Sequence, residues 1–109
     1  MTKAPRQREI KATKNPLYLK AVRSLSCCIC DGFGFTQTSA TAAHHVIHGR
    51  YGMTKTPDRM AIPLCEGHHQ GDQDTSKIAL HREPDMWRDA YGLDTEYTAA
   101  TQDILDQIT

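Results

Sequence analysis

The sequence predicts a small α+β domain in which a β-hairpin and flanking helices are held together by a metal ion. Two short Cys/His pairs, Cys27-x-x-Cys30 and Cys65-x-x-His68, enclose residues 31–64. Two strand-like segments lie within or at the end of this insert, and helical spacing appears before and after it. The 109 residues suffice for one domain, and with 39% apolar residues its core is thin. A metal ion would therefore supply part of the stability.

The first element expected is a helix that begins after Asn15. Asn15 can cap it and Pro16 suits its first position. The stretch "PLYLKAVRSL" then places three apolar residues on one face, namely Leu17, Ala21 and Leu25. The next stretch, "CCICDGFGFTQTS", combines a Cys-x-x-Cys spacing with two glycines. It predicts a tight turn of the zinc-knuckle kind.

Two strands are expected next, joined by a loop. "TAAHHVI", residues 41–47, is rich in small and β-branched residues and predicts a strand. "HGRYGMTKTPD", residues 48–58, has two glycines and a proline and predicts a loop. "RMAIPLC", residues 59–65, predicts a second strand that returns towards the first. Pro63 places this strand at an edge or near its end.

The remainder of the chain is expected to be mainly helical. Residues 66–77, "EGHHQGDQDTSK", contain two glycines and exclude a long helix. A helix is expected over residues 84–92, since Pro84 suits its start and Gly92 can end it. Its apolar side would comprise Trp87, Ala90 and Tyr91. Residues 97–108 predict a terminal packing helix with Ile104, Leu105 and Ile108 at helical spacing.

The net charge of zero conceals a gradient along the chain. Residues 1–23 hold seven Lys and Arg against Glu9, whereas residues 66–109 hold ten acids against three bases. We expect residues 1–14 to be a flexible basic arm and residues 15–109 to be the folded domain. A basic arm fits contact with DNA, although the same composition suits a solvated tail. The acidic C-terminal half would repel DNA, so any DNA-binding face belongs to the first two-thirds.

Whether the four cysteines form disulfides or bind a metal depends on the cellular compartment of the protein. The segment "MTKAPRQREIKATKNP" lacks the apolar middle of a signal peptide, and no apolar run approaches a membrane span. We therefore expect a cytoplasmic protein without a membrane partner. In that reducing setting the four cysteines are expected to be metal ligands rather than disulfides.

The two short-spaced pairs predict a structural zinc site. Cys27, Cys30, Cys65 and His68 supply the thiolate and imidazole ligands that tetrahedral zinc takes. The long insert between the pairs would be a hairpin closed at its base by the metal. Cys28 is left over and is expected to be a small buried residue. The competing interpretation is a set of incidental buried thiols with an exposed histidine.

The remaining histidines predict a second site. If His68 closes the zinc site, its neighbour His69 faces elsewhere. Alternation along a strand likewise sends His44 and His45 to opposite sides. These residues, with His81, could form a second metal site, although His81 also suits a surface position. His48 is expected to be a loop residue and receives no role.

The pattern "CCIC…AHH…KTPDRMAIPLCEGHH…H" resembles the HNH endonucleases, also called ββα-metal or His-Me finger nucleases. It is most similar to a phage and prophage branch that includes the recombination-enhancement nuclease Ref, over residues 26 to 92. The resemblance implies a ββα-metal fold with His45 as general base. It implies His44 and His69 as ligands of a catalytic metal. Asp58 occupies the region of the family's central Asn. In the family a further histidine follows soon after the second metal ligand, whereas here the next histidine after His69 is His81, twelve residues later.

Metal-dependent hydrolysis of DNA phosphodiester bonds is the function that the resemblance implies, in phage or prophage DNA recombination or processing within the host cell. The cofactors would be structural Zn²⁺ and a catalytic divalent metal (Mg²⁺, Mn²⁺ or Zn²⁺). The partners would be DNA and, for that role, a recombination protein. Asp58 could orient His45, act as an extra ligand, or simply stabilise a turn. Arg50 and Lys55 are placed in the loop to hold phosphates.

Two other functions also fit the sequence. One is a zinc-stabilised DNA- or protein-binding module without catalysis, which the missing Asn would explain. The other is a structural phage accessory protein.

Overall fold

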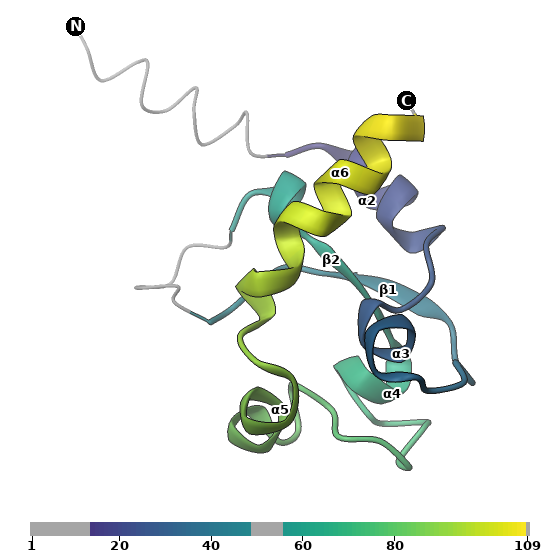
Figure 1. The fold of residues 1–109 in the computed structure, drawn as a ribbon, viewed down its shortest axis with the longest axis vertical. Helices are drawn as coiled ribbons and strands as arrows, with labels where there is room; N and C mark the ends of the chain where they lie inside the picture. The colour runs from purple at the N-terminus through teal and green to yellow at the C-terminus, as the bar shows by residue number, and fades with distance from the viewer. Residues whose placement is uncertain (1–13, 49–55, 109) are drawn as a thin grey trace, which may run out of the picture.

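The computed structural model describes residues 14–48 and 56–108 and has an α+β architecture (Figure 1). Two short strands form its sheet, and helices surround them. The elements in chain order are α2 (Pro16–Arg23), α3 (Cys28–Phe33), β1 (Thr41–His44), the 3₁₀ turn η1 (Asp58–Met60), β2 (Ile62–Cys65), α4 (Glu66–His69), α5 (Pro84–Tyr91), the 3₁₀ turn η2 (Asp94–Tyr97) and α6 (Thr98–Ile108).

The two strands pair in an antiparallel manner, which confirms the predicted return of the second strand. Thr41 lies opposite Cys65, and His44 lies opposite Ile62. The first strand was predicted over residues 41–47 but ends at His44. Beyond that point the backbone N–H groups of Ile47 and His48 donate to a side-chain carboxylate instead of a neighbouring strand.

The start of α2 agrees with the sequence, and its predicted apolar face agrees in part, since Ala21 and Leu25 are half-buried against the α2–α6 cluster. Asn15 accepts the Tyr18 N–H at 3.2 Å and caps the helix, and a proline occupies its first turn. The buried residues are Tyr18 and Val22, whereas Leu17 is 78% exposed. Both sets recur every four residues, so periodicity could not separate them. Packing against Leu105 of α6 selects the Tyr18 face.

The cysteine-rich stretch forms a short helix, and the prediction of a tight turn there was wrong. Cys27 precedes α3, and its sulfur accepts the Cys30 N–H at 3.5 Å. A thiol therefore takes the place that a hydroxyl or carboxylate usually fills at the start of a helix. The helix ends at Gly34, whose φ of 78° is a conformation that glycine adopts without strain.

The C-terminal helices lie where the sequence predicts them, with smaller apolar faces. In α5, Trp87 and Tyr91 are buried, but Ala90 is exposed. In α6, Leu105 is buried at 2% exposure, while Ile104 is 48% exposed. The side chain of Ile108 lies outside the described residues. Each of these short helices therefore contributes only a narrow stripe to the core.

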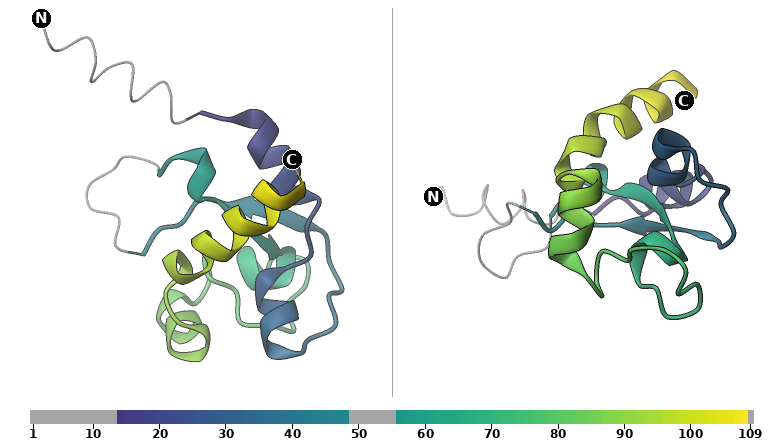
Figure 2. Two further views of the ribbon diagram at one scale, coloured as in Figure 1. Left: turned by 45° about the horizontal axis from the view of Figure 1, so that its top comes forward. Right: turned by 60° about the horizontal axis from the view of Figure 1, so that its bottom comes forward.

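The sheet lies between helices, and two clusters of apolar residues hold the layers together. Figure 2 (right) shows α6 on one side of the hairpin and α4 on the other. A smaller cluster joins α2 to α6. The main cluster includes Ile29, Val46, Ile62, Leu64, Leu80 and Trp87, together with the three buried cysteines. Among the described residues, no helix has the length and apolar content needed to cross a bilayer.

Candidate metal centre

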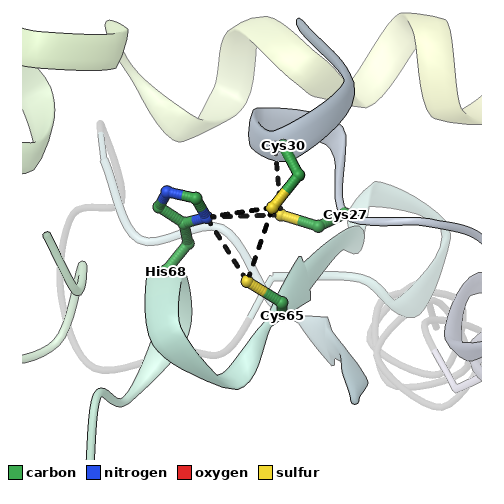
Figure 3. Close-up of side chains that lie close together, drawn as sticks. All are labelled: Cys27, Cys30, Cys65 and His68. Atoms are coloured by element: carbon green, nitrogen blue, oxygen red, sulfur yellow. Dashed lines mark hydrogen bonds between the residues drawn. The ribbon is translucent and has the colours of Figure 1, made fainter. Parts of the chain in front are cut away.

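Three cysteines and one histidine meet at the base of the hairpin (Figure 3). Cys27 and Cys30 come from the start of α3, Cys65 ends β2, and His68 lies in α4. The sulfurs of Cys30 and Cys65 are 3.8 Å apart. His68 Nδ1 lies 3.3 Å from the sulfur of Cys65 and 3.6 Å from each of the other two sulfurs. We call these four residues the Cys3His group.

The distances within the Cys3His group match those around a tetrahedral zinc ion. With Zn–S bonds of about 2.3 Å and Zn–N bonds of about 2.0 Å, tetrahedral ligands have S···S distances of about 3.8 Å and S···N distances of about 3.5 Å. In this group the sulfurs of Cys30 and Cys65 are 3.8 Å apart, and His68 Nδ1 lies 3.3–3.6 Å from the three sulfurs. All four residues are buried. The group can therefore bind a structural metal such as zinc, as the spacing predicted.

The thiols of this group are not equivalent. A hydrogen bond from the Cys27 thiol lowers the pKa of Cys65 to about 3, helped by His68 and opposed by burial. The same hydrogen bond raises the pKa of Cys27 well above its usual value. The group thus holds a thiolate at Cys65. Since thiolates are the form that binds metals, this site is prepared for a cation.

Helix α5 supports the histidine of the Cys3His group. Trp87 Nε1 donates to the backbone carbonyl of His68 at 3.0 Å. The Tyr91 hydroxyl lies 3.5 Å from His68 Nε2, on the side of the ring away from the sulfurs. Cys28 is outside the group and only half-buried, so the expectation of a buried residue holds in part. Burial raises the pKa of its thiol to about 12.

Three of the remaining histidines form a second group. His44 ends β1, His69 ends α4, and His81 lies in the segment before α5. Each offers a ring nitrogen, and these atoms all lie within 4.8 Å of one another, so they could hold a metal ion. The His81 N–H donates to the His69 carbonyl at 3.0 Å, which brings residues twelve apart into contact. We call these residues the three-histidine group.

Burial and the neighbouring histidines keep His69 of this group neutral. Burial, together with the charges that His44 and His81 would carry, lowers the pKa of His69 to about 4. At neutral pH His69 is therefore an uncharged imidazole. Neutral imidazole is the form of histidine that binds metals.

His45 lies outside the three-histidine group and contacts Asp58 instead. Its Nε2 is 2.7 Å from Asp58 Oδ1, and 20% of the His45 side chain is exposed. Asp58 Oδ2 accepts the Asn15 N–H at 2.6 Å. Of the roles that the sequence left open for Asp58, this geometry matches orientation of His45.

Each adjacent histidine pair is therefore divided between two environments, as the alternation argument expected. His44 is 1% exposed in the three-histidine group, whereas His45 faces Asp58. His68 belongs to the Cys3His group, and His69 belongs to the three-histidine group. The two groups are consequently one residue apart along α4.

Asp94 is a site residue that the sequence did not indicate. It is completely buried at the start of η2 and accepts a hydrogen bond from His44 Nε2 at 2.8 Å. Burial raises its pKa, but the hydrogen bonds from His44 and from the backbone at residues 47 and 48 outweigh that effect and leave the pKa lowered. His48, which received no role, accepts the Asp94 N–H at 2.8 Å.

The two residues expected to bind phosphates lie outside the part of the chain that the structure describes. Arg50 and Lys55 lie outside the described residues, as does most of the basic arm. The exposed basic side chains near the start of the described part are Lys14, Lys20 and Arg23, and Arg59, Arg82 and Arg88 are exposed further along the chain.

The fold and its side-chain groups define a small α+β domain in which one β-hairpin and the following helix contribute residues to both a Cys3His group and a three-histidine group. The chain belongs to the DUF968 family, described as "Protein of unknown function", whose family model matches residues 2–107. No curated protein and no solved structure matches the chain.

Proposed function

We propose that this protein is a metal-dependent endonuclease of the HNH type that hydrolyses DNA phosphodiester bonds. One observation carries the proposal. A histidine hydrogen-bonded to a carboxylate, His45 with Asp58, directly follows a member of the three-histidine group in the chain. His44 and His69 lie on β1 and α4, His45 directly follows β1, and the His81 N–H donates to the His69 carbonyl. The resemblance to the HNH nucleases implies histidines on a strand–strand–helix unit of this kind.

His45 is suited to accept a proton. Hydrolysis of a phosphodiester needs a base that removes the proton of the attacking water. Because an ionised Asp58 carboxylate can accept hydrogen bonds but cannot donate them, the 2.7 Å contact assigns the ring proton to Nε2 of His45. Nδ1 is then the basic nitrogen. The Asn15 N–H holds Asp58, so the carboxylate and the ring have a defined orientation.

The three-histidine group supplies the place for a catalytic cation. A divalent cation bound there would stabilise negative charge on the phosphate and the leaving oxygen. The chain contributes imidazole nitrogens from β1, α4 and the segment before α5. Since these ligands are all nitrogen atoms, they favour Zn²⁺ over Mg²⁺.

The distribution of charge supports DNA as the substrate. The basic arm leads directly into Asn15. The N–H of Asn15 donates to the Asp58 carboxylate. The basic arm thus joins the folded domain beside the His45–Asp58 pair. Lys20 and Arg23 of α2 are also basic and exposed. A role in phage or prophage recombination, with a recombination protein as partner, follows from the resemblance.

A plasmid-nicking assay tests the proposal. The zinc-loaded protein is incubated with supercoiled plasmid and added Mg²⁺, Mn²⁺ or Zn²⁺. We expect conversion to open circles, and His45→Ala should slow it by a factor of about 10² or more, the usual contribution of a general base. Met86→Ala changes an exposed residue of α5 and should nick at the wild-type rate.

The other two functions predict different results from the same protein. Salt-dependent gel retardation without nicking in any metal would contradict the proposal and identify a zinc-stabilised DNA-binding module. If the protein neither nicks nor binds DNA, the proposal is contradicted and the structural accessory protein is the remaining interpretation.

A further inference from the structure

Asp94 is the most deeply buried carboxylate in the described part of the chain, and it lies far from the histidines in sequence. It is 0% exposed and begins η2, directly after the segment that follows α5. A buried carboxylate is costly unless hydrogen-bond donors surround it. The identity of its donors therefore indicates what the residue is for.

The donors come from one short segment that begins with a member of the three-histidine group. Asp94 Oδ2 accepts from His44 Nε2 at 2.8 Å and from the Ile47 N–H at 2.7 Å. Asp94 Oδ1 accepts from the His48 N–H at 3.1 Å. In return, the Asp94 N–H donates to His48 Nδ1 at 2.8 Å. The carboxylate thus holds both the His44 ring and the backbone that follows it.

An ionised carboxylate accepts hydrogen bonds and donates none, so His44 must carry its proton on Nε2. Nδ1 is then the nitrogen that keeps a lone pair. We propose that Asp94 is a positioning residue that holds His44 with Nδ1 available to a cation and thereby raises the metal affinity of the three-histidine group. This inference rests on the proposed function in one respect, that the three-histidine group binds a cation.

The carboxylate contributes in two ways. It prevents the His44 ring from turning, and its charge makes the ring a more basic ligand. An asparagine in its place has no good arrangement. If its NH2 faces His44, the ring must move its proton to Nδ1. If its oxygen faces His44, the NH2 points at the His48 N–H, and two donors meet.

The test compares Asp94→Asn with Glu96→Gln. Glu96 lies in the same 3₁₀ turn and accepts the Leu93 N–H at 3.1 Å, so its substitution is a matched carboxylate-to-amide control. Proteins that retain zinc in the Cys3His group are titrated with Co²⁺ by calorimetry. We expect the Kd of the three-histidine group to rise by about 10- to 100-fold in Asp94→Asn, the usual effect of losing such a partner, and to stay unchanged in Glu96→Gln.

A spectroscopic measurement on the wild-type protein keeps the inference testable if Asp94→Asn does not fold. The ¹⁵N signals of His44 should show a protonated Nε2, with and without Zn²⁺ in the three-histidine group. Zinc bound through Nε2 would overturn the inference.

Two titration results also have distinct meanings. A wild-type Kd in Asp94→Asn, accompanied only by a lower melting temperature, would mean that Asp94 merely secures the backbone, and would overturn the inference. Absence of a second cation in the wild-type protein would overturn the proposed function, and the inference with it.

Discussion

Cys65 is the residue on which the Cys3His group depends most. It ends β2, precedes α4 and carries the thiolate of the group. Structural zinc contributes folding free energy directly, on the order of 10 kcal/mol in small domains. We therefore expect Cys65→Ser to release zinc and to lower the melting temperature sharply.

Cys28→Ser is the matched control for this change. Cys28 lies outside the group and is only half-buried, so its substitution should keep the zinc and alter the melting temperature little. Zinc content by elemental analysis and melting by circular dichroism check both variants. Unchanged zinc content and melting temperature in Cys65→Ser would contradict a structural zinc site in the Cys3His group.

The Cys3His group was predictable from the sequence because its members occur as two short-spaced pairs, and His44 and His69 were indicated because each has a histidine neighbour. Cys27-x-x-Cys30 and Cys65-x-x-His68 each place two ligands on one turn, and adjacent histidines must point to different sides. Asp94 gave no such signal. It lies fifty residues after His44, and only the packing of η2 against the end of β1 brings them together.

At the level of elements, α2 connects the N-terminal part of the chain to the site. Asn15 makes two contacts at its start: its side chain caps the helix, and its N–H donates to Asp58. Asn15→Ala would remove the cap but leave the N–H. Loss of such a cap costs about 1 kcal/mol, so we expect the free energy of unfolding to fall by that amount.

Asn15→Ser provides the control, because serine is also a good residue at the start of a helix. Urea unfolding of the zinc-loaded proteins measures the difference. If the Ala and Ser variants were equally stable, the cap would contribute nothing to this domain.

The positions of the elements were easier to predict than their buried faces. Capping residues mark helix ends locally, so α2 and α5 begin and end close to the expected residues. Which side is buried depends on the partner. Leu17 repeats at the same interval as Tyr18, yet only Tyr18 faces Leu105. The helix α3 was missed because a thiol, an unusual capping group, begins it.

For the whole molecule, the main feature is that one short unit supplies two residues to each group. The hairpin and α4 hold Cys65 and His68 for one group and His44 and His69 for the other. A structural metal would fix α4 against β2 and so determine where His69 lies. Each chain should therefore bind two cations with different functions, and variants of the adjacent histidines should lose them separately.

Four single alanine variants test whether each chain binds two cations with different functions, through their metal content and nicking activity. Native mass spectrometry counts the cations bound by each protein, and plasmid nicking measures activity. The account predicts two cations in the wild type. His68→Ala should lose the structural zinc and be destabilised. His44→Ala and His69→Ala should fold but lose the second cation and cleavage. His45→Ala should keep both cations and nick more slowly by about 10² or more. Near-normal nicking by His45→Ala, or equal loss of zinc in all four variants, would contradict it.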